Sequence, residues 1–169
     1  IVNEAIKNKK IKKGGIVVEG SAGNTGIGLA IVTKAYGIGL KIVIPKTQSI
    51  EKKQTLKKLG AELIEVDAVP YSNPNNYIKQ SKKIAEELSS SNENGVLWAN
   101  QFDNTVNSDA HIQTTAQEIW TQTAGQIHGF VCSAGTGGTL AGVSIGLKEK
   151  NKNIKIALAD PMGSSLYSH

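Results

Sequence analysis

The sequence predicts an α/β fold in which parallel sheets lie between layers of helices. Short apolar segments rich in Ile and Val alternate with longer amphipathic segments along the 169 residues, and this alternation is typical of β-α-β units. Two glycine-rich turns, at 21–26 and 135–139, each join an apolar segment directly to a helical segment. These observations favour a three-layer αβα arrangement, whose ligands bind at the carboxyl ends of the strands.

The predicted elements follow one another in a regular order. Strands are expected at 15–19, 41–45, 61–66, 95–98, 130–133 and 154–158. Helices are expected at 1–10, 24–37, 50–59, 73–89, 109–123 and 139–148. The pattern contains neither an internal repeat nor a low-complexity segment.

Local signals mark several helix ends. Ser49 is a typical N-cap for the helix 50–59, and Gly60 is a typical residue after a helix end. Asn73-Pro74 is expected to open the helix 73–89, because proline is favoured in a first helical turn. In the helix 24–37, the side chains expected to face the sheet are those of Ile27, Ala30, Ile31 and Ala35.

The polar loop 100–104 is the expected domain boundary, which divides the chain into domains at 1–104 and 105–169. The chain begins inside a helical pattern at Ile1, and residues 160–169 leave a strand without a further element. We interpret the chain as an internal piece of a longer protein, so both domains are expected to be incomplete.

The composition argues against several classes of partner. The net charge of +5 comes from lysine alone, with no arginine for bidentate phosphate contacts and no interleaved aromatic residues, so nucleic-acid binding is disfavoured. No apolar run approaches the length of about 20 residues that a membrane helix needs. The single cysteine, Cys132, is expected to be buried in a strand, which favours a reducing compartment such as the cytoplasm. No His, Cys, Asp and Glu cluster has metal-ligand spacing.

The two glycine-rich turns have the chemistry of anion sites. A strand that opens directly into a helix presents free N–H groups and the positive end of the helix dipole. Two such turns suggest a ligand with two anionic ends, such as an amino acid joined to pyridoxal phosphate. The turn at 135–139 does not match the dinucleotide-binding pattern G-x-G-x-x-G, because Leu140 stands where the third glycine belongs. The Gly-Lys-Ser/Thr tripeptide of a nucleotide-binding P-loop does not occur in the sequence. For each turn the alternative is an ordinary βα turn whose glycines serve packing.

Polar residues also follow the strand 95–98, where Asn100 and Gln101 add a third polar segment to the two glycine-rich turns. Since the carboxyl ends of parallel strands meet at one edge, we expect a cleft there, between two domains. His111 lies near a helix start, and we interpret it as a packing or loop residue rather than a base.

Three segments resemble cysteine synthase (O-acetylserine sulfhydrylase) and cystathionine β-synthase. The run from Glu19 to Gly26, Glu-Gly-Ser-Ala-Gly-Asn-Thr-Gly, resembles their substrate-carboxylate loop. Asn100-Gln101-Phe102, followed by His111 and Thr114-Thr115, resembles the next segment. The turn Gly-Thr-Gly-Gly-Thr at 135–139 looks like their loop for the phosphate of pyridoxal phosphate (PLP).

The resemblance implies a fold type II, tryptophan-synthase-β-like PLP enzyme. Residues 1–104 would be part of its smaller N-terminal domain and residues 105–169 part of its larger PLP-binding domain. The residues that would bind the substrate carboxylate are Ser21, Ala22, Gly23, Asn24, Thr25 and Gln101, and Asn24 would also reach the phenolic oxygen of PLP. The residues that would hold the phosphate are Gly135, Thr136, Gly137, Gly138 and Thr139.

Some family features fall outside this chain or differ in it. The Schiff-base lysine and the partner of the pyridine nitrogen would lie beyond its ends, so none of its lysines is assigned a catalytic role; Lys34 and Lys41 are interpreted as surface residues. Ala22 stands where the family usually has serine, and Asp160-Pro161 replaces the usual Glu-Pro. Both departures bear on the choice of substrate.

The implied activity is PLP-dependent β-replacement, in which O-acetylserine and sulfide give cysteine. The alternatives within the fold are cystathionine β-synthase, which uses a thiol, cysteine desulfhydrase and serine or threonine dehydratase. An inactive anion-binding fragment is the alternative of another class. The resemblance also implies a homodimer when the protein is full length.

Overall fold

The computed structural model describes residues 1–164 and divides the chain into two compact units, Ile1–Gln101 and Phe102–His169. The division falls inside the polar loop 100–104, where the sequence predicts a boundary. The last part of the terminal stretch 160–169, on which the prediction of an internal piece depends, lies outside the described residues.

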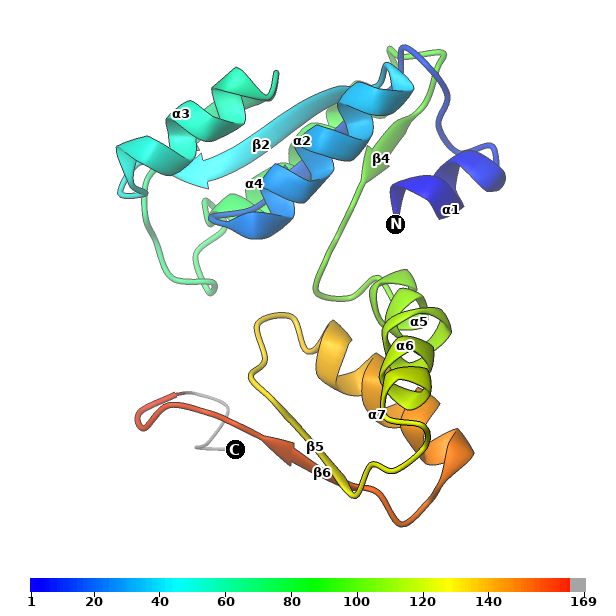
Figure 1. Ribbon diagram of the computed structural model, residues 1–169. Helices are drawn as coiled ribbons and strands as arrows, with labels where there is room; N and C mark the ends of the chain where they lie inside the picture. The colour runs from blue at the N-terminus through cyan, green and yellow to red at the C-terminus, as the bar shows by residue number, and fades with distance from the viewer. Residues whose placement is uncertain (165–169) are drawn as a thin grey trace. The chain divides into compact units, whose positions relative to one another are not determined.

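Four parallel strands form the sheet of the first unit (Figure 1). They are β1 (Ile16–Gly20), β2 (Gly39–Pro45), β3 (Glu62–Val66) and β4 (Val96–Trp98). Their order across the sheet is β3-β2-β1-β4, so the chain winds outward from β1 to β3 and then returns to the other side of β1. In the registers, Val17 of β1 lies opposite Leu40 of β2 and Leu97 of β4.

Helices cover both faces of this sheet. The helices α1 (Val2–Lys7), α2 (Asn24–Tyr36) and α3 (Ile50–Lys58) share one core with the sheet, whereas α4 (Tyr77–Ser89) packs against β1, β2 and β4. Glycines mark which helices lie on each face. On one face, a Cβ on Gly20 of β1 would meet Ile78 of α4. A Cβ on Gly26 would meet Leu56 of α3 and Ile42 of β2. The predicted three-layer αβα fold is confirmed.

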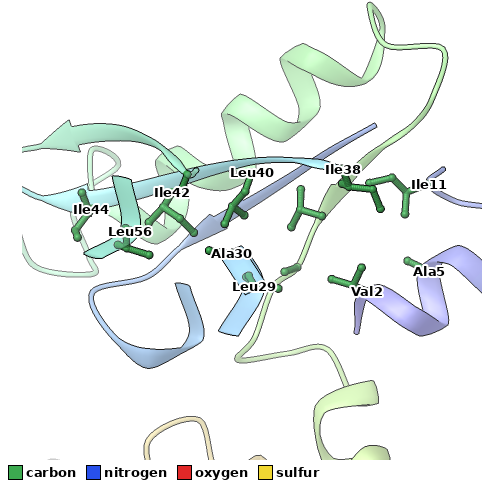
Figure 2. Close-up of a cluster of buried hydrophobic side chains, with 13 residues drawn as sticks. Val2, Ala5, Ile11, Leu29, Ala30, Ile38, Leu40, Ile42, Ile44 and Leu56 are labelled. Atoms are coloured by element: carbon green, nitrogen blue, oxygen red, sulfur yellow. The ribbon is translucent and has the colours of Figure 1, made fainter. Parts of the chain in front are cut away.

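The core of the first unit lies between the sheet and the helices α1 to α3 (Figure 2). Leu40, Ile42 and Ile44 alternate along β2 and are almost fully buried against Leu29 of α2 and Leu56 of α3. Burying a side chain of this kind contributes about 1.5–3 kcal/mol.

The prediction for the inward face of α2 is partly wrong. Ala30 is buried, but Ile31 is 57% exposed and Ala35 is exposed. The buried stripe instead includes Thr33, whose hydroxyl donates to the Leu29 carbonyl at 2.7 Å. Because that bond satisfies the hydroxyl within the helix, a threonine can replace an apolar residue on the buried face.

Helix boundaries follow their capping residues. As predicted, Ser49 caps α3, accepting from the Lys52 amide at 3.4 Å, and Gly60 follows the helix with φ +95°. The predicted start of α4 at Asn73 is wrong. Asn76 caps α4 by accepting from the Ile78 amide at 3.0 Å, so the helix begins at Tyr77.

The second unit contains β5 (Gly129–Cys132) and β6 (Lys155–Leu158), which are parallel, and three helices. The helices are α5 (Val106–Gln113), α6 (Thr115–Gln122) and α7 (Gly138–Lys150). The single helix predicted at 109–123 is therefore two, which break at Thr114 with φ −118° and ψ −73°. The hydrophobic core of the second unit includes Val143 and Leu147 of α7.

Cys132 is only half-buried in β5, although the sequence predicts a buried position. Its neighbour Val131 is 64% exposed. In the part of the chain that the structure describes, β6 is the only strand paired with β5, so much of the strand surface has no cover.

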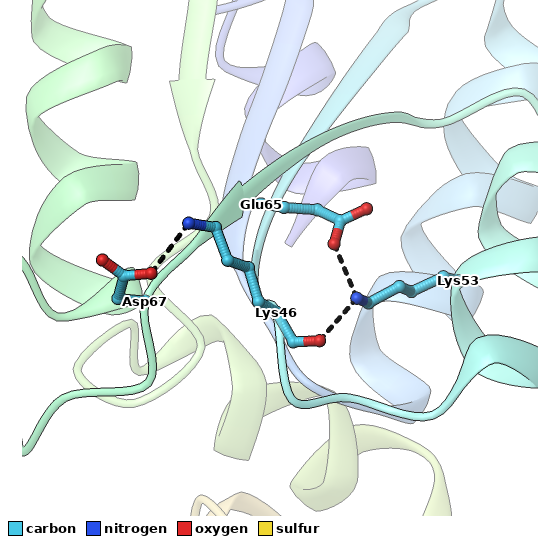
Figure 3. A network of polar contacts seen from close by, with 4 residues as sticks. All are labelled: Lys46, Lys53, Glu65 and Asp67. Atoms are coloured by element: carbon cyan, nitrogen blue, oxygen red, sulfur yellow. Dashed lines mark hydrogen bonds and ion pairs between the residues drawn. The ribbon is translucent and has the colours of Figure 1, made fainter.

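Ion pairs join the ends of β2 and β3 to α3 (Figure 3). Lys46 pairs with Asp67 at 2.8 Å, and Lys53 pairs with Glu65 at 2.6 Å. Lys53 also donates to the Lys46 carbonyl at 2.7 Å. Such surface pairs contribute about 0–1 kcal/mol each. They balance lysine charge locally.

The helices of the described region are short, and α2, α4 and α7 each have 13 residues. Within residues 1–164 no helix combines the length and apolar character needed to cross a bilayer. Over the same residues, no three side chains of His, Cys, Asp or Glu gather where they could hold a metal ion.

A row of glycines lets α7 approach α5 and α6 closely. A Cβ on Gly138 would lie 2.5 Å from the Asn107 side chain, and one on Gly142 would lie 2.3 Å from the Ser108 carbonyl oxygen. A Cβ on Gly146 would lie 2.6 Å from the Cβ of Ala116. The residues are four apart, so they share one face of α7. A side chain at Gly142 would meet backbone, which cannot rotate away.

Replacing Gly142 with valine in the full-length protein should therefore lower the free energy of unfolding by about 2 kcal/mol or more. Urea unfolding followed by circular dichroism measures the change. The control is Gly28→Ala on α2, where a Cβ meets no atom within 4 Å; it should raise stability by about 0.5–1 kcal/mol. Equal stability of the Gly142→Val variant and the native protein would contradict the close packing of α5 on α7.

Candidate active site

The loops that follow β1 and β4 meet where the strand order reverses. The chain leaves β1 toward β2 through α2 and reaches β4 through α4, and these helices lie on opposite faces of the sheet. Because β4 pairs in parallel with β1 on the side away from β2, the loops that follow β1 and β4 lie side by side at the carboxyl edge, which is where open α/β sheets bind ligands. The loop 21–26 follows β1, and Asn100 and Gln101 follow β4.

Ser21 holds the loop after β1 in shape. Its Oγ accepts hydrogen bonds from the amides of Gly23 at 3.3 Å and Gly26 at 3.2 Å. Gly23 precedes α2 without a side-chain cap. Within residues 1–164, the amides of Asn24 and Thr25, the first two of α2, have no acceptor. These donors stand at the positive end of the helix and suit a carboxylate.

The predicted substrate residues differ in how far they are exposed. Asn24 is exposed, and Ala22, Gly23 and Thr25 are half-buried. Ser21 is only 3% exposed, and both acceptor positions of its hydroxyl oxygen are used inside the loop. The structure thus gives Ser21 a supporting position, and its contact with substrate stays a prediction.

Gln101 lies beside the loop, as the resemblance implies. Its Oε1 accepts from the Thr25 hydroxyl at 2.5 Å, and its Nε2 donates to the Gly20 carbonyl at 3.3 Å. The Gln101 side chain is buried, and its amide is oriented by these two partners. Thr25 and Gln101, which are 76 positions apart in sequence, are therefore brought into direct contact.

Glu19, the last charged residue before the loop, is buried beneath it with 1% exposure. Burial raises its pKa to about 7, while hydrogen bonds from the Gln101 and Asn100 backbone and from the Gln101 side chain act in the opposite direction. Its Oε2 has no hydrogen-bond partner among the described residues. The pKa of Tyr77 is also raised, mainly by burial and to a smaller extent by the nearby charge of Glu19. The sequence signal for this site is a lone acidic residue inside an apolar strand.

The turn at 135–139 lies between β5 and α7. Gly137 precedes α7 with φ +82°, a conformation that favours glycine. A Cβ on Gly135 or Gly137 would meet no atom within 4 Å, so the turn lies beside open space. Thr136 is half-buried and Thr139 is exposed at the start of the helix. The predicted phosphate residues therefore form one turn of amides and hydroxyls.

Two α5 residues support this turn, and the sequence patterns do not assign them to it. Asn107 donates from Nδ2 to the Thr136 hydroxyl oxygen at 2.9 Å. His111 contacts the Thr139 hydroxyl through Nε2 at 3.2 Å and the Thr115 hydroxyl through Nδ1 at 2.9 Å. The sequence predicts His111 to be a packing or loop hydrogen-bonding residue rather than a base, and its contact with Thr139 agrees with the second of these interpretations. The i, i+4 spacing of Asn107 and His111 places both on one face of α5.

An α/β protein with a glycine-rich anion turn in each unit fits an enzyme that handles a phosphate and a carboxylate. The sequence profile of the pyridoxal-phosphate dependent enzymes matches residues 1–169. The chain belongs to this family.

Individual relatives agree with this assignment. Cysteine synthase 1 of Emericella nidulans is 49% identical, over 100% of this chain and 45% of its own length. The O-acetylserine dependent cystathionine beta-synthase of Bacillus subtilis is 39% identical, over 98% of this chain and 52% of its own. A hydrogen sulfide-producing enzyme of Fusobacterium nucleatum has a crystal structure that matches with a TM-score of 0.83 and 38% identity, covering 99% of this chain and 54% of that one. The chain thus spans about half the length of these relatives.

The donor set of the 135–139 turn fits the phosphate of PLP. Thr136 Oγ1 accepts from Asn107 and also from the Gly138 amide at 3.3 Å, so its hydrogen is left to donate. A Cβ at Gly135 or Gly137 would extend into the space beside the turn. Amides and hydroxyls are the donors from which a phosphate dianion accepts hydrogen bonds.

The raised pKa of Glu19 predicts a pH-dependent stability. Between its usual value of 4.5 and about 7, folded Glu19 keeps a proton that the unfolded chain releases. The stabilisation is complete below the unfolded pKa and is lost as the pH rises through 7. Relative to Glu19→Gln, the free energy of unfolding of the full-length protein should fall by up to about 3 kcal/mol between about pH 5 and pH 8.

Urea unfolding of both proteins at several pH values tests this prediction. Glu65→Gln is the matched control, because the hydrogen bond from Lys53 lowers the pKa of the exposed Glu65 carboxyl. The control should therefore show no comparable trend in this range. If the difference between the native protein and Glu19→Gln does not change with pH, Glu19 does not titrate there.

Proposed function

We propose that the whole protein catalyses a PLP-dependent β-replacement on an activated serine, in which O-acetylserine and sulfide give cysteine. The observation that carries the proposal is the pair of unpaired amides of Asn24 and Thr25 beside the Thr25–Gln101 contact. They supply a site for one carboxylate at the switch point of the sheet. The names of the relatives support the reaction, since several are cysteine synthases.

In this proposal the residues of the chain bind and orient the reactants. The α2 amides and the Thr25 hydroxyl hold the carboxylate of the amino acid, and the turn 135–139 holds the phosphate of the cofactor. Fixing the carboxylate restricts rotation of the amino acid and so orients its Cα–H bond. PLP, when bound, supplies the electron sink for loss of that proton and of the β-substituent.

The Thr25–Gln101 hydrogen bond determines what must change when a substrate carboxylate binds to Thr25. The Thr25 hydroxyl has one hydrogen, which it donates to Gln101 Oε1. A carboxylate that accepts this hydrogen must take it from Gln101. The Gln101 amide is then released on one side while Gly20 and Glu19 still hold its Nε2 side. This exchange makes Gln101 the residue that responds to substrate.

Cystathionine β-synthase activity is the second candidate. The Bacillus subtilis relative carries that name together with dependence on O-acetylserine, and the Fusobacterium nucleatum relative is named for hydrogen sulfide production. The contacts at 21–26 concern the amino-acid carboxylate, which all these reactions share. The nucleophile, sulfide or a thiol, must be distinguished by assay.

We further propose that the whole protein is a homodimer in the cytoplasm. The homodimer is supported by the family resemblance. A reducing compartment is supported by the presence of one cysteine, Cys132, in the 169 residues.

Replacing Thr25 with valine in the full-length protein should reduce kcat/KM for O-acetylserine about 10- to 100-fold, because a hydrogen bond to a charged group is lost. PLP content, measured by absorbance, should be unchanged. Thr25→Ser keeps the hydroxyl and serves as the control, with kcat/KM within a few-fold of the native protein. Equal loss in both variants would argue against hydroxyl binding of the carboxylate.

The reaction itself is tested by supplying O-acetylserine with sulfide or homocysteine and identifying the products by mass spectrometry. Cysteine from sulfide is the expected product. Cystathionine alone would favour the second candidate. A full-length protein that binds PLP but converts neither pair would contradict the proposed β-replacement.

A further inference from the structure

The phosphate turn at 135–139 depends on α5 for the direction of its hydroxyl hydrogens. The close approach of α7 to α5 at Gly138 and Gly142 places Asn107 and His111 against Thr136 and Thr139. A Cβ on Gly142 would lie 2.7 Å from the Cβ of His111, so a larger residue there would displace the imidazole. The glycine row therefore serves the turn as well as the packing.

The Thr136 hydroxyl shows how this support works. Its oxygen accepts from Asn107 Nδ2 at 2.9 Å and from the Gly138 amide at 3.3 Å. A hydroxyl has two acceptor positions and one hydrogen. With both acceptor positions filled from the protein, the hydrogen can only donate away from these two groups.

Counting donors and acceptors in the same way favours one tautomer of His111. A neutral imidazole has one N–H donor and one acceptor nitrogen. If Nδ1 carried the hydrogen, Nε2 would accept the hydrogen of Thr139 and withdraw it from any ligand. The half-buried Thr115 hydroxyl would then have no acceptor within residues 1–164 and would depend on solvent, since it hydrogen-bonds there to no group other than His111.

With the hydrogen on Nε2, every group is paired. The Thr115 hydroxyl donates to Nδ1 at 2.9 Å, and Nε2–H donates to the Thr139 oxygen at 3.2 Å. The Thr139 hydrogen is then free to donate to an anion. We propose that His111 is a positioning residue which, as the Nε2–H tautomer, directs the Thr139 hydroxyl hydrogen toward the cofactor phosphate. This inference rests on the proposed assignment of the 135–139 turn to that phosphate.

The test compares the affinities of PLP and of pyridoxal, which lacks the phosphate, for the full-length apoprotein. His111→Leu removes the donor and should weaken PLP binding about tenfold, the value of roughly one hydrogen bond to a charged group. Pyridoxal affinity should not change. His111→Gln restores an N–H donor at a similar reach and should bind PLP within about threefold of the native protein.

Thr139→Val separates this inference from the assignment of the turn. If Thr139→Val leaves PLP affinity unchanged, the Thr139 hydroxyl does not contact the phosphate and the inference fails at its premise. If Thr139→Val weakens PLP binding but His111→Leu does not, only the role of His111 fails. In the Thr139→Val background, His111→Leu should have no further effect. Equal weakening of PLP and pyridoxal by His111→Leu would show a merely structural role and overturn the inference.

The tautomer can be measured without any substitution. In the native full-length protein with PLP, ¹⁵N NMR shifts of the His111 ring should show a protonated Nε2 and an unprotonated Nδ1. The opposite tautomer would overturn the inference, whatever the variants do.

Discussion

The structure depends on one constraint: around each anion turn, the protein must satisfy the polar groups that support the turn while leaving donors for the ligand. Buried donors and acceptors without partners cost about 1–3 kcal/mol each. Ser21 meets this constraint after β1 by accepting the Gly23 and Gly26 amides inside the loop. Asn107 and His111 meet it after β5 by occupying the threonine oxygens of the second turn.

Strand order explains why the first turn has a partner. If β4 lay beyond β3, two strands, β2 and β3, would separate Gln101 from Thr25. Because β4 instead pairs with β1 at the opposite side from β2, the carboxyl ends of β1 and β4 are adjacent. The Glu19 carboxyl bridges them by accepting from the Asn100 and Gln101 backbone. An ionisable group is thus retained in the core where two functional loops must keep their register.

Much of the fold can be predicted from the sequence because its signals are local. Apolar runs, Ser49 as a cap and Gly60 as a helix end each act within a few residues, and the structure confirms them. The errors came from side-chain hydrogen bonds that the apolar pattern does not reveal. The inward face of α2 includes Thr33 rather than Ile31, because a hydroxyl satisfied within the helix can be buried. Likewise, the start of α4 is fixed by the Asn76 side chain, which also donates to the Val69 carbonyl.

The candidate site likewise contains residues that the sequence predicts and residues that it does not. The glycine turns were visible in sequence because amides at a strand–helix junction need small residues. The contacts of Asn107 and His111 with the second turn could not be predicted, since they depend on the packing of α5 on the α7 glycines. Glu19 had a signal, a carboxylate in an apolar strand, but its partners lie about 80 positions away.

A crystal structure of the full-length protein with PLP and an amino-acid ligand tests the central claim most directly. The account predicts that phosphate oxygens accept from the amides and hydroxyls of the turn 135–139, and that the ligand carboxylate accepts from the Asn24 and Thr25 amides. The internal bonds of Ser21, Asn107 and His111 should be unchanged. A phosphate bound elsewhere, or a turn that must break these bonds to hold it, would contradict the account.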